Sequence, residues 1–207
     1  MGRALTITAS PWWLFVTLAS TIVALAPVVS SGSVTHYPDA DVAVSWNAAG
    51  NNYSHIDEVG EPTTDSVYAT VITKKDVYRV AITTAVPDDS IVDSVVLFVR
   101  GRKTGGMFAG EIKLLLMDST TTTYDYSAVV ALTTTAANYT KSWATNPFTA
   151  AAWTVADANA TRYRVGMIHD IDDGTPISIY QLNKVVYYHA ETPAAGAPTQ
   201  SVIGGVD

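Results

Sequence analysis

Short runs of β-branched and aromatic residues, separated by turn-forming residues at regular intervals, most constrain the fold of this chain. Threonine supplies 27 of the 207 residues, and there are 11 tyrosines. These side chains suit a pleated, half-buried strand better than a helix. The sequence therefore predicts an all-β fold, a jelly roll or β-sandwich of about nine strands. The candidate strands are Asp41–Trp46, Ser66–Thr73, Val77–Ala85, Ser94–Arg102, Gly110–Met117, Tyr124–Thr133, Asn138–Trp143, Arg162–His169 and Ile177–His189.

One short helix is predicted beside these strands, over Thr149–Ala160, where three alanines, Trp153 and Ala156 share one side. The small polar residues Ser30–Ser33 are expected to form a flexible joint. The predicted organisation is an apolar arm over residues 1–33, one β-sandwich domain over 34–192, and a flexible tail over 193–207 that is rich in Pro, Gly and Ala.

Composition excludes several classes of protein. The chain has no cysteine, so it is not a disulfide scaffold, a zinc finger, an iron–sulfur protein or a thiol enzyme. Its net charge is −7, without the clustered Lys and Arg that nucleic-acid backbones require. No hydrolase, zinc-protease or phosphate-loop motif is present, and the four histidines have no metal-ligand spacing. We therefore expect a protein that is not an enzyme and does not bind nucleic acid.

The first 33 residues form a separate problem, because no charged residue occurs from Ala4 to Pro38 and Pro11–Val29 is almost wholly apolar. A secretory signal peptide fits this pattern. A membrane anchor over residues 11–29 also fits, although Pro11 and Pro27 interrupt the run of about 20 apolar residues that a span needs. A third interpretation is a retained arm buried between neighbouring subunits. That arm would dock through its large apolar side chains, Trp12, Trp13, Leu14, Phe15, Ile22 and Val23.

Three stretches of sequence occur together in a recognisable order. The first is His36–Trp46 with Tyr53–Glu58 and Thr64–Tyr68, the second is Tyr139–Pro147 with Ala151–Asp157, and the third is Ile179–Tyr188. Together they resemble a jelly-roll module of virion structural proteins of tailed phages, which is also seen in secreted microbial surface proteins. The resemblance implies a β-sandwich used as a building or decorating module, and it brings no catalytic residues. The apolar arm departs from the pattern, since the phage modules begin close to the equivalent of Tyr37.

Two groups of residues are candidate binding sites. Asp170, Asp172 and Asp173 precede Gly174, and carboxylates at alternate positions can hold Ca²⁺, although a turn between two strands explains the same residues. Trp143 and Trp153 lie at strand or turn boundaries, where large rings are expected to close the ends of the core. The alternative is that these two rings face a glycan.

These observations favour a structural protein of a multi-subunit assembly, a capsid or tail subunit or decoration of a virion. Its partners would be copies of itself and other structural subunits, and its arm would dock between neighbours. One alternative is a secreted or surface-anchored microbial filament or pilus subunit, extracellular or at the cell surface, that assembles by strand or arm donation. A second alternative is a carbohydrate-binding module.

Overall fold

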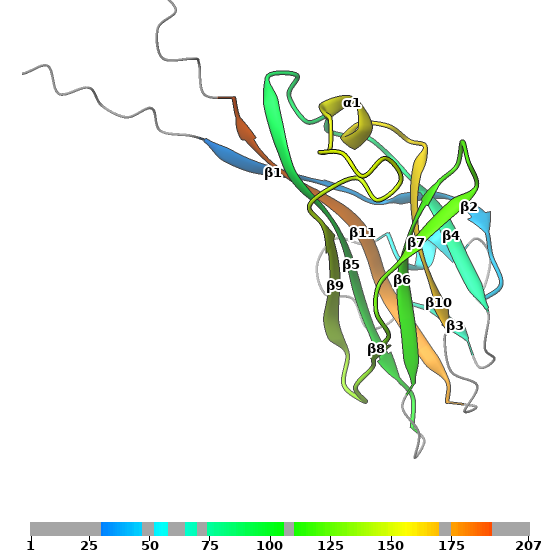
Figure 1. Ribbon diagram of the computed structural model, residues 1–207. Helices are drawn as coiled ribbons and strands as arrows, with labels where there is room; N and C mark the ends of the chain where they lie inside the picture. Colours follow the sequence, from blue (N-terminus) through cyan, green and yellow to red (C-terminus); the bar gives the residue numbers. More distant parts are fainter. Residues whose placement is uncertain are drawn as a thin grey trace, which may run out of the picture.

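The computed structural model describes residues 30–46, 52–57, 65–69, 74–105, 110–169 and 175–191. These residues form two antiparallel sheets packed face to face, as Figure 1 shows. Sheet A contains β1 (Ser31–His36), β3 (Val67–Ala69), β5 (Ser90–Lys103), β9 (Ala137–Trp143) and β11 (Ile177–Ala190). Sheet B contains β2 (Pro38–Ala43), β4 (Lys75–Val80), β6 (Glu111–Asp118), β7 (Thr123–Tyr126), β8 (Val130–Ala131) and β10 (Tyr163–His169). The predicted all-β sandwich is confirmed.

Strands that are distant in sequence are neighbours in each sheet. Sheet A has the order β1-β11-β5-β9, with β3 also paired to β11, and sheet B has the order β2-β4-β10-β6-β7, with β8 also paired to β6. The long strands β5 and β11 pair along their whole length, from Ser90 opposite Ala190 to Lys103 opposite Ile177. The last described strand therefore lies at the centre of sheet A, between the first strand and β5.

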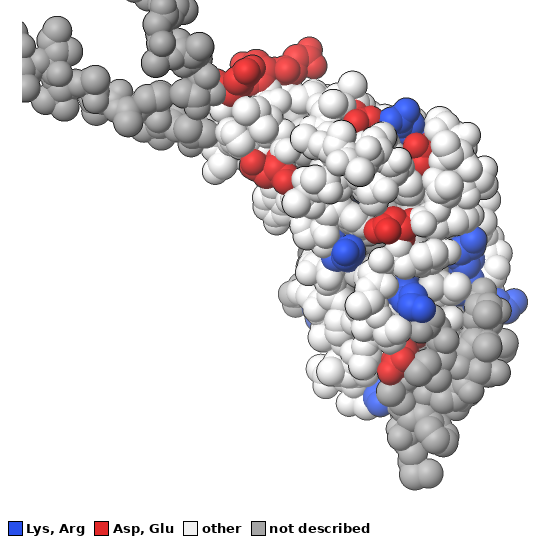
Figure 2. Space-filling view, viewed as in Figure 1, with Lys and Arg blue, Asp and Glu red and all other residues white. Residues whose placement is uncertain are grey.

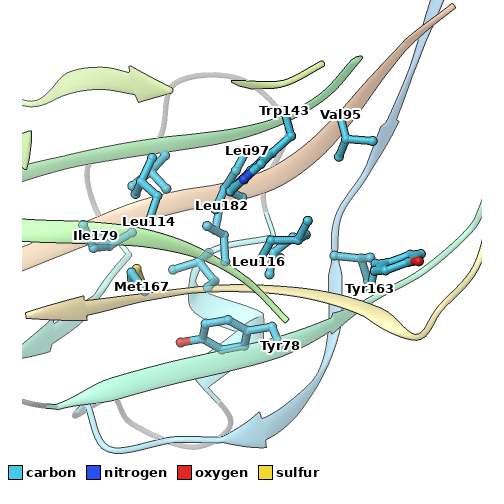
Figure 3. Close-up of a cluster of buried hydrophobic side chains, with 14 of the residues drawn as sticks. Tyr78, Val95, Leu97, Leu114, Leu116, Trp143, Tyr163, Met167, Ile179 and Leu182 are labelled. Atoms are coloured by element: carbon cyan, nitrogen blue, oxygen red, sulfur yellow. The ribbon is translucent and has the colours of Figure 1, made fainter. Parts of the chain in front are cut away.

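The core lies between the two sheets, where alternate residues of each strand point inward. Figure 3 shows Leu97 and Leu182 of sheet A beside Leu114 and Leu116 of sheet B. All four of these leucines are fully buried, as are the two tyrosines Tyr78 and Tyr163. Burial of this much apolar surface is the main stabilising contribution to such a sandwich.

The helix is much shorter than the sequence predicts. Only Val155–Ala158 is helical, as α1, and the Thr154 hydroxyl caps it by accepting from the Asp157 N–H at 3.0 Å. The segment before it cannot continue the helix, because Ala150 has a φ of 56°. No helix among the described residues is long and apolar enough to cross a membrane.

The first strand begins inside the residues that the sequence assigned to the arm. Ser31–Ser33 pair with Tyr187–His189 of β11, so the prediction of a flexible joint over Ser30–Ser33 is wrong. The physical reason is that the backbone of β11 pairs with these residues, and a prediction from neighbouring residues alone does not include a partner so distant in sequence.

Candidate functional site

Trp143 and Trp153, expected at the ends of the core, are buried there, and so is Trp46. Trp46, Trp143 and Trp153 are 4%, 5% and 4% exposed. Each indole N–H is satisfied internally, by Lys74 O at 2.8 Å, by an Asp125 carboxylate oxygen at 2.5 Å and by Trp143 O at 2.9 Å, respectively. Neither Trp143 nor Trp153 presents an open ring face for a sugar, so the glycan-facing alternative for these residues is wrong. The chain closes its core over both rings.

The other sequence-derived candidates lie outside the described residues. This holds for Asp170, Asp172 and Asp173, and for the arm residues Trp12, Trp13, Leu14, Phe15, Ile22 and Val23. Within the described ranges, no three His, Asp or Glu side chains come together as a metal site. The calcium site and the docking arm therefore stay predictions.

A surface hollow of about 290 Å³ lies at the end of sheet A where β1 begins and β11 ends. We call it the Tyr187 hollow, and its lining residues are Ser31, Gly32, Ser33, Asp93, Tyr187 and Tyr188. Tyr187 is 46% exposed. The strand register places Ser33 of β1 opposite it on one side and Ser94 of β5 opposite it on the other. An aromatic ring therefore stands between two serines.

A β-bulge shapes this hollow. Between Tyr187 and Tyr188 the pairing of β11 with β5 shifts from Ser94 to Val92, which leaves Asp93 as the extra residue. Bulges re-aim side chains in this way. The carboxylate of Asp93 lies 2.8 Å from Nδ1 of His189, and both side chains remain partly exposed. A carboxylate is thus held beside the exposed tyrosine.

Gly32 is needed for the hollow to have this form. A Cβ at this position would lie 2.8 Å from the ring of Tyr188, closer than Cβ contacts occur in proteins. The absence of a side chain lets Tyr188 pack beneath β1 against the core. The hollow is consequently supported by paired strands and a packed ring, so it is formed before any ligand arrives.

Sequence reasoning missed two buried polar groups inside the sandwich. The first is the carboxylate of Asp76 on β4, which is 0% exposed. Its two oxygens accept hydrogen bonds from the N–H groups of Ser45 and Trp46, from the Asn52 amide and from the Tyr78 hydroxyl. Burial, together with Asp76, raises the pKa of Tyr78 above its usual value, so this hydroxyl stays protonated and donating. Asp76 thereby holds Ser45, Trp46 and Asn52 against the core.

The second group is a pair of buried bases, His36 on β1 and Lys184 on β11, which lie opposite each other in register. Both are almost fully buried. Lys184 Nζ donates to the carbonyl of Ala158 at 3.1 Å, and His36 Nε2 lies 3.0 Å from the carbonyl of Thr84. Burial lowers the pKa of Lys184 to about 8. Burial, with the nearby charge of Lys184, lowers the pKa of His36 to about 4.

Comparisons with known proteins give a fold likeness alone. No protein-family model and no curated protein matches the chain. Among solved structures, similarity extends to the xylan-binding module CBM15, with 14% identity, a TM-score of 0.40 and coverage of 75% of this chain and 97% of that one. A CBM29-2 mutant complexed with mannohexaose gives 9% identity, a TM-score of 0.41 and coverage of 76% and 93%. A family 29 carbohydrate-binding module from Piromyces equi gives 7% identity, a TM-score of 0.37 and coverage of 81% of this chain and 96% of that one. Similarity at this level carries no conclusion about ligands.

Proposed function

We propose that this protein is a non-catalytic module that binds carbohydrate in the Tyr187 hollow. The observation that carries the proposal is the exposed ring of Tyr187, standing between Ser33 and Ser94 beside the carboxylate of Asp93. A sugar ring has an apolar C–H face that packs on an aromatic ring, and hydroxyls at its edge that need donors and acceptors. The hollow supplies both kinds of contact.

The rigidity of the hollow supports the same function. Its residues belong to β1, β5 and β11, which are hydrogen-bonded to one another. The chain therefore orders no loop when it binds, and the entropic cost of association is smaller than for a mobile site. Ligand specificity would come from the serine hydroxyls and Asp93, since apolar contact with a tyrosine distinguishes sugars poorly.

The hollow and the adjacent His189 together contain the residue types of a hydrolytic triad, which makes catalysis the competing hypothesis. Asp93 contacts Nδ1 of His189, and Ser31 lies opposite His189 in register. Among the interactions of the described residues, however, no hydrogen bond joins Ser31 to His189, so the serine hydroxyl has no base to activate it. This geometry supports binding rather than hydrolysis.

We expect Tyr187→Ala to weaken glycan binding at least about tenfold, since the ring contributes most of the apolar contact. The measurement is affinity electrophoresis and calorimetry of the full chain against soluble xylan, glucomannan and mixed-linkage β-glucan. Tyr68→Ala is the matched control, because Tyr68 on β3 is 45% exposed and lies away from the hollow.

Two results would overturn the proposal. One is binding by Tyr187→Ala as tight as that of the unchanged protein, and the other is an absence of binding to every neutral glycan of the panel. Release of reducing sugar by the unchanged protein, abolished in Ser31→Ala, would establish the hydrolytic hypothesis instead.

A role in an assembly stays a prediction. It depends on the apolar arm, whose residues lie outside the described part of the chain. Glycan binding is compatible with such a role, since a decorating module and a surface protein both present an exposed face.

A further inference from the structure

A second apolar cluster lies on the outer side of sheet B, away from the core. Val77, Leu115 and Met117 are buried there, and Tyr124 packs against them. These residues alternate along β4 and β6 with side chains that face the core, such as Tyr78, Leu114 and Leu116. Apolar side chains on an outer sheet face require a cover, and the side chains around them provide it.

The strand register shows which residues provide the cover. Each row of neighbours across the sheet mixes apolar with cationic or aromatic side chains. The rows are Lys75–Ile168–Lys113, then Val77–Gly166–Leu115–Tyr126, then Arg164–Met117–Tyr124. We call Lys75, Lys113, Tyr124, Tyr126 and Arg164 the cationic–aromatic face. Four strands contribute to it, spanning about 14 Å at the usual spacing between strands.

Lys75 is held over an aromatic ring of this face. Its Nζ lies 3.8 Å from the ring centroid of Tyr124. The rings of Tyr124 and Tyr126 are stacked, with centroids 6.1 Å apart, and Tyr126 is 40% exposed. A cation and an open ring therefore stand side by side.

The charge of this face is opposite to that of the whole chain. Lys75, Lys113 and Arg164 project from its strands, and among the described residues of β4, β6, β7 and β10 the carboxylate that alternation places on the same side is Glu111 at the end of β6. Asp39 of the neighbouring strand β2 is paired with Arg79 of β4. Asp125 of β7 does not belong to this face, since its carboxylate accepts a hydrogen bond from the indole N–H of Trp143 at 2.5 Å. Figure 2 shows Lys and Arg side chains over the middle of the molecule with Asp and Glu among them, and further Asp and Glu toward the end where β1 begins and β11 ends. A local cationic surface on a chain of net charge −7 selects for an anionic ligand.

We propose that the cationic–aromatic face binds an acidic polysaccharide, a chain of sugar rings that carry carboxylates. A ring of this chain packs on Tyr126, while its carboxylate pairs with Lys75, Lys113 or Arg164. The breadth of the face across four strands suits an extended polymer. A nucleic acid fits less well, because its closely spaced phosphates would meet three cations here and carboxylates elsewhere on the surface. This site uses a different sheet from the Tyr187 hollow and stands independently of it.

The test is equilibrium binding of the full chain to polygalacturonate, with neutral galactan and single-stranded DNA as comparison probes. We expect binding to polygalacturonate that weakens as salt is raised, and weaker binding to both other probes. Tyr126→Ala and the double variant Lys75→Gln/Lys113→Gln should each weaken it at least about tenfold. Both variants change partly exposed side chains, and unfolding curves will show whether they stay folded.

Matched controls separate this site from the first. Lys141→Gln on β9 and Tyr68→Ala on β3, both in the other sheet, should leave polygalacturonate binding unchanged. Unchanged binding in Tyr126→Ala would overturn the proposal, as would equally tight binding of single-stranded DNA, which would show a general polyanion surface. Loss of polygalacturonate binding in Tyr187→Ala would place the acidic glycan in the hollow instead, and would also overturn it.

Discussion

Replacement of Asp76 by alanine is expected to lower the free energy of unfolding by about 4 kcal/mol. The carboxylate accepts four hydrogen bonds, from the N–H groups of Ser45 at 2.5 Å and Trp46 at 2.9 Å, from the Asn52 amide at 2.9 Å and from the Tyr78 hydroxyl at 2.7 Å. Its removal leaves donors without acceptors in a site that water does not reach. Each donor left without an acceptor costs roughly 1–3 kcal/mol, and the total is smaller than the sum because some of these donors can move to other acceptors.

The change should also be local. Asn52 and Tyr53 are also held by Asp41, whose carboxylate accepts hydrogen bonds from both of their N–H groups. Without Asp76, Ser45 and Trp46 therefore loosen before the sheets separate. We expect the indole of Trp46, which is 4% exposed in the native protein, to become more accessible to a fluorescence quencher.

Urea unfolding curves of the variant and the unchanged protein measure this effect. Asp88→Ala is the control, because Asp88 is exposed in the turn before β5 and should change stability by less than about 0.5 kcal/mol. Asp76→Asn preserves shape but places an amide N–H₂ against existing donors, so it should also destabilise. A loss below about 1 kcal/mol in Asp76→Ala would contradict our account of this site.

The sequence predicts the architecture well where alternation is local. Val95, Leu97 and Val99 repeat with a period of two, and they form the inward side of β5 in the structure. Pairing partners are not encoded in this way. Ser31–Ser33 become a strand because β11, some 150 residues later, lies beside them. The predicted helix over Thr149–Ala160 fails for a similar reason, since a turn at Ala150 interrupts a segment of high helix propensity.

Parts of the candidate sites could have been found from the same alternation. In Lys75–Val80, Asp76 falls on the side of Tyr78 and Val80, which marks it as an inward carboxylate in need of partners. Tyr187 likewise falls between inward-facing Val186 and Tyr188. The hollow itself was out of reach, because the bulge that brings Asp93 to Tyr187 is a shift in register between two distant strands.

Replacement of Lys184 by methionine is the second large effect, and its direction is stabilising. We expect the free energy of unfolding at pH 7 to rise by about 2 kcal/mol. Lys184 is 1% exposed, and its ammonium has the carbonyl of Ala158 as its hydrogen-bond acceptor. Burial lowers the pKa of this amine from 10.5 to about 8, which corresponds to a cost of about 3 kcal/mol for the charged form. Methionine fills a similar volume without charge. The loss of the hydrogen bond to Ala158 offsets about 1 kcal/mol of the stabilisation that removal of the buried charge provides.

The pH dependence distinguishes this cause from better packing. Between pH 8 and 10 the unfolded chain still binds a proton at Lys184 that the folded chain releases, so stability contributed by this group rises with pH. His36 acts in the same direction at lower pH, because its pKa is lowered from 6.5 to about 4 and the unfolded state takes up the proton first as pH falls. The unchanged protein should therefore lose stability from pH 6.5 towards pH 4 and gain it from pH 8 to pH 10.

In Lys184→Met the gain between pH 8 and 10 should disappear. The loss below pH 6.5 should shrink, since the charge of Lys184 is one cause of the lowered pKa of His36. Urea unfolding at several pH values measures both changes, and Lys74→Met, at an exposed position before β4, is the control for removing a positive charge. A Lys184→Met protein that is less stable than the unchanged protein at pH 7, or that keeps the rise above pH 8, would mean that Lys184 is not a buried, uncompensated charge, because only such a charge makes its own removal stabilising.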